Sequence, residues 1–279
     1  MHKNKNLIVI AGPTASGKTL KAIEMALNKS IEIFSADSRQ IYKELHIGVA
    51  KPTMNELKLV NHHFINHISI QDIYNAGTYE EEFNQKINTY FQSNDEAILV
   101  GGTGFYIQAA IHGLDSFPEV PENILEELDK EYISFGLEPL TEELKVKDFD
   151  TFNTIDIKNS RRVLRALSVI RASGKKFSEL KSGNKKEKKF NIEYHYIDLP
   201  RDQLYERINQ RVEDMIHIGL IDEVKSLLPY KHLKSMQTVG YQELFAFFDG
   251  HISKEKAIDQ IKQNTRNYAK RQVTWFKKF

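Results

Sequence analysis

The eight residues from Gly12 to Thr19 constrain the fold of this chain more than any other segment. They read Gly-Pro-Thr-Ala-Ser-Gly-Lys-Thr and directly follow the apolar run from Leu7 to Ala11. In such a loop, backbone N–H groups surround phosphate oxygens, the lysine adds a positive charge, and the threonine hydroxyl can ligate Mg²⁺. The sequence therefore predicts a strand, a loop and a helix that together bind a diphosphate or a triphosphate. The loop residues expected at the phosphates are Gly12, Thr14, Ala15, Ser16, Gly17, Lys18 and Thr19.

Short apolar runs alternate with helical patterns through about residue 115. A helical pattern from Lys18 to Leu27 precedes a strand pattern from Ile31 to Ser35, and the pattern from Tyr79 to Phe91 precedes a strand pattern from Ala97 to Val100. Strands that alternate with helices predict a doubly wound parallel sheet, which binds ligands beyond the carboxyl ends of its strands. We therefore expect an α/β core of the P-loop NTPase-like type.

The pattern changes between about Phe117 and Asn191, where long helical patterns replace the strands. Acidic residues dominate the first half of this segment and basic residues dominate the second half, from Lys158 to Lys189. The run from Tyr194 to Leu199 then alternates like a returning strand. We expect a discontinuous catalytic core of residues 1–115 and 194–279, with an inserted all-helical domain of residues 116–193.

Composition restricts the functions that this chain can have. A net charge of +1 gives no general attraction for a polyanion, so a nucleic-acid surface has to come from local clusters. The chain has no cysteine, which excludes a disulfide framework and a thiolate metal site. The polar start from Met1 to Asn6 and the short apolar run after it fit neither a signal peptide nor a membrane span. We expect a cytoplasmic protein with no membrane partner.

Two local clusters of basic residues stand out. In the first, helical spacing places Lys158, Arg162 and Arg165 on one face, opposite an apolar face of Val163, Leu167 and Ile170. In the second, near the C-terminus, basic residues alternate with aromatic ones: Arg266, Tyr268, Lys270, Arg271, Trp275, Phe276, Lys277 and Lys278. Two such faces on a nearly neutral chain favour nucleic-acid binding over an ordinary charged surface.

The acidic residue that usually accompanies a phosphate loop is missing. In most proteins with this loop, a carboxylate at the end of a second strand helps to hold Mg²⁺, yet the strand ending at Val100 is followed by Gly-Gly-Thr. This argues against routine ATP hydrolysis. The nearest suitable carboxylate is Asp37, two residues beyond the second strand. Its position fits a general base for an acceptor substrate, and it fits a turn or helix-capping aspartate equally well.

Other polar residues leave their roles open. Adjacent histidines point apart, so His62, His63 and His67 favour structural roles over a metal site. The hydroxyl of Thr103, in the glycine loop after Val100, is expected to point into the ligand crevice. Arg207 and Arg211 lie one helical turn apart, where a guanidinium can bind a phosphate or form an ion pair within the protein.

Taken together, these segments resemble the tRNA dimethylallyltransferase family, also called tRNA isopentenyltransferases, over almost the whole chain. The resemblance rests on five motifs in a distinctive order. They are Gly12 to Thr19, Asp37 to Tyr42 with Ile47 to Pro52, Gly101 to Tyr106, Val239 to Tyr241, and Ala269 to Phe276.

The resemblance implies transfer of a dimethylallyl group from dimethylallyl diphosphate to N6 of the adenine just 3′ of the anticodon in tRNA. It implies that Lys18, Ser16, Arg211 and Thr19 with Mg²⁺ stabilise the departing diphosphate. It also implies that Asp37 accepts the amine proton and that Thr103 positions the reacting groups, after the adenine has left its stack. The tRNA contacts that the resemblance implies are Asp37, Ser38, Arg39, Gln40, Thr103, Arg161, Arg162, Arg165, Gln237, Gly240, Tyr241, Gln242, Lys270, Arg271, Trp275 and Lys277.

Three positions depart from the pattern of this family. Arg39 stands where many members have an apolar residue, Gln242 where many have a basic one, and Ile124 where some have an arginine that faces tRNA. Two alternative functions remain at this point. One is an adenylate isopentenyltransferase that acts on a free nucleotide. The other is a nucleotide-binding RNA module without transferase activity. We expect the protein to be a monomer.

Overall fold

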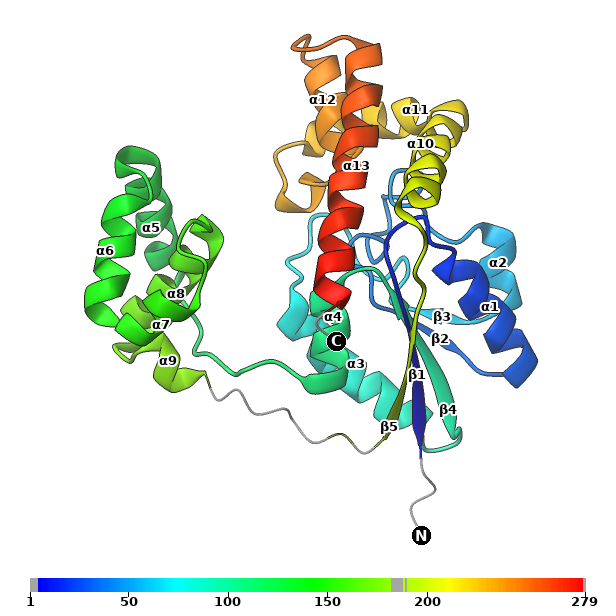
Figure 1. Ribbon diagram of the computed structural model, residues 1–279, viewed down its shortest axis with the longest axis horizontal. Helices are drawn as coiled ribbons and strands as arrows, with labels where there is room; N and C mark the ends of the chain where they lie inside the picture. Colours follow the sequence, from blue (N-terminus) through cyan, green and yellow to red (C-terminus); the bar gives the residue numbers. More distant parts are fainter. Residues whose placement is uncertain (1–4, 182–187, 189, 278–279) are drawn as a thin grey trace. The chain divides into compact units, whose positions relative to one another are not determined.

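The computed structural model describes residues 5–181, 188 and 190–277, and the chain divides into two compact units (Figure 1). One unit contains Met1–His112 and Glu187–Phe279, and the other contains Gly113–Lys186. The second unit begins about three residues, and ends about seven residues, before the boundaries expected from the sequence. Lys278, and residues 182–187 and 189 of the basic run that ends at Lys189, lie outside the described residues.

The first unit is built on a five-stranded parallel sheet. The strands are β1 (Asn6–Ala11), β2 (Ile33–Ser35), β3 (His62–His63), β4 (Glu96–Gly101) and β5 (Asn191–Tyr196), in the order β3-β2-β4-β1-β5. β1 pairs along its whole length with both β4 and β5, and its residues from Leu7 to Ala11 are buried. β1 is therefore an internal strand, and the run before the phosphate loop is apolar throughout because both of its faces are covered.

The returning strand differs in its limits from the expectation. β5 begins at Asn191 and ends at Tyr196, whereas the alternation in the sequence suggested Tyr194 to Leu199. β5 is an edge strand, and its first three residues are exposed. Exposed residues carry no apolar alternation, so the start of this strand has no signal in the sequence.

Helices complete the first unit. They are α1 (Lys18–Lys29), α2 (Met54–Leu59), α3 (Ala76–Tyr90), α4 (Gly104–His112), α10 (Arg201–His217), α11 (Leu220–Ser226), α12 (Tyr241–Phe248) and α13 (Lys254–Phe276), with the short 3₁₀ helices η1 (Leu228–Tyr230) and η2 (Lys234–Met236). Figure 1 shows α1 and α2 on one side of the strands, and α3 and α4 on the other. α1 packs its buried residues Ala22, Ile23 and Ala26 on the sheet residues Ile8 and Ile10. None of the described helices combines the length and the apolar content that a membrane crossing needs.

The described residues of the second unit form helices and no strand. These are α5 (Glu122–Phe135), α6 (Glu138–Lys147), α7 (Phe149–Thr154), α8 (Ser160–Ser173) and α9 (Phe177–Leu180). The apolar face predicted for α8 is confirmed, since Val163, Leu167 and Ile170 lie in the core of this unit. Ile124 packs against the same core, which explains an apolar residue at a position where some members of the resembled family have an arginine.

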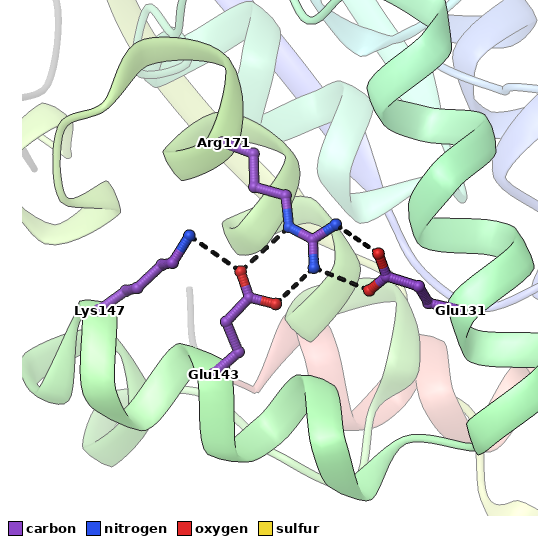
Figure 2. Close-up of polar contacts among 4 residues, drawn as sticks. All are labelled: Glu131, Glu143, Lys147 and Arg171. Atoms are coloured by element: carbon purple, nitrogen blue, oxygen red, sulfur yellow. Dashed lines mark hydrogen bonds and ion pairs between the residues drawn. The ribbon is translucent and has the colours of Figure 1, made fainter.

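An ion network joins three helices of the second unit (Figure 2). Arg171 of α8 donates to both carboxylate oxygens of Glu131 on α5, at 2.9 and 2.8 Å, and to Glu143 on α6, at 3.0 Å from its Nε. Lys147 adds a contact of 3.0 Å to Glu143. The hydrogen bonds that Arg171 donates to Glu131 and Glu143 raise the pKa of Arg171 above its usual value, and the same bonds lower the pKa of Glu131. The positive charge of Arg171 is therefore neutralised by carboxylates of its own unit.

Candidate functional site

The phosphate loop lies between β1 and α1, as the sequence predicts. Gly17 is the residue that precedes α1, and its φ of 93° is a conformation that glycine adopts without strain. A Cβ atom at Gly12 would lie 2.7 Å from the Ile197 carbonyl oxygen, so the close approach of the chain after β5 requires glycine there. In the described part of the chain no side chain caps α1, and the first turn of this helix has no acidic residue. The N-terminus of α1 is thus suited to an anion.

Ser16 has a hydroxyl that the protein leaves unsatisfied. The residue is only 4% exposed, and its Oγ has no hydrogen-bond partner among the described residues. Buried polar atoms nearly always have a partner, because a lost hydrogen bond to water is costly. A ligand oxygen at the loop would supply that partner.

Two cationic side chains converge on this loop. The Lys18 Nζ donates to the Pro13 carbonyl oxygen at 2.6 Å, and the Arg211 Nη1 lies 3.4 Å from the Thr14 hydroxyl. The pKa of Lys18 is lowered to about 7, mainly by burial; the charge of Asp37 opposes this shift and the charge of Arg211 adds to it. Burial also lowers the pKa of Arg211. Within the described part of the chain, neither side chain forms an ion pair, so both are available to an anion.

Asp37 occupies the turn after β2. Its Oδ1 accepts hydrogen bonds from the backbone N–H groups of Arg39, at 2.8 Å, and Gln40, at 3.3 Å. The turn interpretation is therefore confirmed, and it is compatible with a role as a base. The two backbone bonds hold one carboxylate oxygen in place and leave the other outside the turn.

Thr103 meets this turn from the loop after β4. The Ser38 N–H donates to the Thr103 hydroxyl at 3.1 Å, and that hydroxyl lies 3.3 Å from the Ser38 Oγ. Tyr268 of α13 also hydrogen-bonds to Thr103; burial and the nearby charge of Asp37 raise the pKa of Tyr268 to about 12. The strand ends thus bring together residues 37, 38 and 103, as expected for a parallel sheet.

The Asp37 turn is also fixed from the other side. Gln40 donates through its Nε2 to the carbonyl oxygens of Ala50, at 2.9 Å, and Val49, at 3.2 Å. Arg39 donates to the carbonyl oxygens of Ser235, at 3.0 Å, and Gln237, at 3.4 Å. The guanidinium of Arg39 therefore connects this turn to the segment before α12.

The segment from Gln237 to Gln242 is divided between buried and exposed residues. Gln242 and Gln237 are bonded to each other through their side chains, and Gln242 is exposed. Tyr241 is fully buried, packs against Gly48 and donates to Glu223. The side chain of Tyr241 was expected at the tRNA surface, and this expectation is corrected: it supports a loop, because Gly48 leaves room for its ring. Gly240, with a φ of 95°, precedes α12.

Basic residues are exposed on both units. Arg161, Arg162 and Arg165 are exposed on α8 of the second unit. In the first unit, Lys270, Arg271 and Lys277 are exposed. Five residues of α13 line a surface cavity of about 440 Å³: Asn267, Lys270, Arg271, Thr274 and Trp275.

The three histidines make separate contacts. His63 bonds to Glu32 at 2.6 Å, His67 bonds to Glu82 at 2.7 Å, and the Nδ1 of His62 contacts the Val60 carbonyl oxygen at 2.8 Å. Among the described residues, no group of three histidine, aspartate or glutamate side chains is arranged to hold a metal ion.

A second cavity, of about 650 Å³, opens on the β5 side of the phosphate loop. It is lined by Ser16 and Gly17 of the loop, by α1 and by β5. Asp37 and Thr103 follow β2 and β4, which lie on the other side of β1. The phosphate loop therefore has Asp37 and Thr103 on one side and this cavity on the other.

Two residues of the site, the buried Gln272 and the half-buried Glu223, were missed in the sequence. Gln272 of α13 accepts from the Thr14 N–H at 2.8 Å and donates to the Gly102 carbonyl oxygen at 2.7 Å. Glu223 of α11 accepts from Tyr241 and from the N–H groups of Ile47, at 2.7 Å, and Gly48, at 3.2 Å. Both residues stabilise loops that are distant in sequence, and no local pattern signals such contacts.

Comparisons with known proteins agree on one family. The family model described as IPP transferase matches residues 40–279. A tRNA dimethylallyltransferase of Cytophaga hutchinsonii is 44% identical over 275 residues, which cover 99% of this chain and 90% of that protein. A tRNA dimethylallyltransferase 1 of Bacteroides thetaiotaomicron is 41% identical, with 98% and 88% covered.

Solved structures show the same similarity. The tRNA isopentenylpyrophosphate transferase of Bacillus halodurans has a TM-score of 0.70 and 34% identity, with 98% of this chain and 87% of that chain covered. A eukaryotic dimethylallyltransferase, described as acting on tRNA, has a TM-score of 0.82 and 28% identity, with 97% and 69% covered.

Proposed function

Because the chain belongs to the IPP transferase family, we propose that it transfers a dimethylallyl group from dimethylallyl diphosphate to N6 of the adenine 3′-adjacent to the anticodon in tRNA, releasing diphosphate. One structural observation supports this proposal independently of the similarity to known proteins. Lys18 and Arg211 lie at the phosphate loop without carboxylate partners in the described structure, close to the turn that holds Asp37. The loop thus offers an anion site, and the neighbouring turn offers a base.

The cations act on the leaving group. As the allylic C–O bond breaks, negative charge grows on the diphosphate, and Lys18 and Arg211 stabilise that charge more strongly than they stabilise the bound substrate. The hydroxyl of Ser16 and the N-terminus of α1 donate to the same oxygens. In this proposal the core has a P-loop NTPase-like architecture that serves a prenyl diphosphate in place of ATP.

Mg²⁺ is the cofactor that fits these residues. It prefers oxygen ligands, retains several waters and often binds through few protein atoms together with substrate phosphates. The hydroxyl of Thr19, in the first turn of α1, would hold it beside the diphosphate. When bound, the ion would neutralise part of the charge of the leaving group.

Asp37 acts on the acceptor. The adenine N6 forms a bond to the allylic carbon, the C–O bond to diphosphate breaks, and the proton from N6 passes to Asp37. Thr103, held by Ser38 and Tyr268, positions the adenine, which must leave its stack to reach this depth.

The exposed basic residues bind tRNA phosphates in this proposal. Arg161, Arg162 and Arg165 form one surface on the helical unit, which we propose as an inserted tRNA-contacting domain. Lys270, Arg271, Trp275 and Lys277 form another surface on α13. Ser38, Gln40, Gln237 and Gln242 lie in segments that complete the contacts. A tRNA substrate implies action in the cytoplasm, and one chain carries all the proposed groups, which is consistent with a monomer.

The test of this function is incubation with unmodified tRNA and dimethylallyl diphosphate, followed by nucleoside analysis for prenylated adenosine. Parallel reactions with AMP as the acceptor separate tRNA from free-nucleotide transfer. Binding measurements with ATP address a nucleotide-binding module. Prenylation of AMP alone, or ATP binding without any transfer, would contradict the proposal.

Asp37→Asn tests the base. Asparagine keeps the oxygen that accepts from residues 39 and 40 but cannot accept the N6 proton, so we expect turnover to fall by about 10³-fold, within the range for general-base catalysis. Binding of tRNA should change by less than about twofold, because the turn is preserved. A variant with a near-normal single-turnover rate would remove Asp37 from this role.

A further inference from the structure

One face of α13, which we call its inner face, contacts the loop around Thr103. Tyr268 hydrogen-bonds to Thr103, Gln272 donates to the Gly102 carbonyl oxygen, and Trp275 lies where a Cβ atom at Gly104 would be 2.2 Å from its ring. These three side chains are spaced by four and three residues, so they lie on one face of the helix. A Cβ at Gly102 would likewise lie 2.5 Å from the Gln272 Nε2. Both glycines beside Thr103 therefore make room for α13.

The outer face of α13 has a different character. Asn267, Lys270, Arg271 and Thr274 line the surface cavity of about 440 Å³, together with Trp275 at the border of the two faces. Their spacing of three, one and three residues places them on a second face of the same helix. One rigid element thus presents cationic groups to the outside and holds the proposed reaction site on its inside.

Gln272 also contacts the phosphate loop. It is 6% exposed, and its Oε1 accepts from the Thr14 N–H at 2.8 Å while its Nε2 donates to Gly102 at 2.7 Å. The Thr14 hydroxyl in turn contacts Arg211. A single buried amide therefore connects the loop that binds diphosphate with the loop that carries Thr103.

We propose that Gln272 is a positioning residue that couples occupancy of the outer face of α13 by tRNA to the affinity of the phosphate loop for diphosphate. This inference rests on the proposed function. When tRNA phosphates hold α13 in place, Gln272 fixes both loops in advance, and the diphosphate then loses less binding energy in ordering them. By linkage, diphosphate strengthens tRNA binding by the same factor.

The test uses inorganic diphosphate with Mg²⁺ as the probe. Its affinity for the full chain is measured calorimetrically with and without saturating unmodified tRNA. We expect tRNA to raise the affinity of the wild-type protein by about tenfold, within the usual range for coupled sites. In Gln272→Met, which keeps the length of the side chain and removes both hydrogen bonds, this factor should fall below about twofold. The affinity for tRNA alone should remain nearly unchanged.

Two further variants keep the inference open to refutation. Gln263→Met is the matched control, because Gln263 is exposed and, in the described structure, its side chain bonds only to Arg266 and Asn267 of the same helix; its coupling should equal that of the wild type. Gln272→Glu retains the acceptor for Thr14 and loses the donor to Gly102, and it replaces Gln272→Met if the latter does not fold. A coupling factor near one in the wild type, or an unchanged factor in the folded Gln272 variants, would overturn the inference.

The proposed function can fail separately. Absence of prenylated adenosine with the wild-type protein would refute transfer to tRNA, whatever the coupling factor. Prenylation with unchanged coupling in the variants would refute only the role of Gln272.

Discussion

Two partly buried arginines, one in each unit, differ in how their charge is satisfied. The guanidinium of Arg171 contacts two carboxylates, and those hydrogen bonds raise its pKa. Arg211 reaches only a hydroxyl at 3.4 Å among the described residues, and burial lowers its pKa. A buried charge without a partner is costly. The contrast suggests that Arg171 serves the fold of its unit, whereas Arg211 is retained for an anion that comes from outside.

The same distinction separates other groups around the phosphate loop. Among the described residues, Lys18 has no carboxylate partner and the Ser16 Oγ has no hydrogen-bond partner, while Asp148 of the second unit accepts bonds from Thr151, at 3.0 Å, and from Ser178, at 2.8 Å. At functional sites, buried polar and charged groups lack the hydrogen-bond or ion-pair partners that such groups have elsewhere in a protein. Substitutions at the two kinds of site test whether this difference marks function.

Among the substitutions that compare the two arginines, the largest expected effect is that of Arg211→Gln on the reaction. Loss of one donor to a developing negative charge typically costs 10²–10³-fold in rate, so we expect prenyl transfer to fall by about 10²-fold. The melting temperature should hold or rise, because an unpaired buried charge is removed. Both are measured on the same preparation, by single-turnover kinetics and by thermal unfolding. A lower melting temperature with an unchanged rate would make Arg211 a structural residue like Arg171.

Arg171→Gln should have the opposite profile. It leaves Glu131 and Glu143 without their shared cation, and we expect the free energy of unfolding of the helical unit to fall by about 2 kcal/mol. This is below the full cost of breaking a buried pair, since Glu131 is 39% exposed and screened by water. Thermal or denaturant unfolding followed by circular dichroism measures the loss.

Lys147→Gln is the control for this variant. It removes the more exposed contact to Glu143 and should cost about 0.5 kcal/mol or less. If Arg171→Gln is no more harmful to stability than Lys147→Gln, the network of Figure 2 is not what holds the three helices together.

The comparison also shows what a sequence can reveal. The phosphate loop, the central strands and the apolar face of α8 were predictable because each is a local pattern with a fixed period or spacing. β3, with two residues, and the exposed start of β5 have no such pattern. Gln272 and Glu223 act on loops that are 170 and 176 residues away, so only the folded chain brings their partners together. Only the folded chain shows that Arg211 has no ion-pair partner among the described residues, because its spacing in the sequence was equally compatible with an ion pair.

Replacement of Arg162 and Arg165 by glutamine tests a third kind of arginine, one that is exposed to solvent. Each lost phosphate contact should reduce the slope of log affinity against log salt by about one, so the double variant should reduce it by about two, and we expect tRNA affinity to fall by about tenfold at moderate salt. Stability should change little, because both side chains are exposed on α8. Filter binding over a series of salt concentrations measures the slope. An unchanged slope would place these arginines with ordinary surface residues.

The smallest expected effect concerns the protonation of Lys18. Burial lowers its pKa to about 7, so at pH 8 the free site is mostly neutral, and a bound diphosphate raises that pKa again. Binding therefore takes up a proton and weakens as the pH rises above about 7, whereas below pH 7 this lysine is already charged and contributes no further pH dependence. Calorimetry at pH 8 in two buffers of different ionisation enthalpy should show uptake approaching one proton. In Arg211→Gln, the pKa of free Lys18 rises because a repelling charge is gone, and the proton uptake at pH 8 should become smaller. Equal uptake in the wild type and in Lys18→Met would assign the proton to another group.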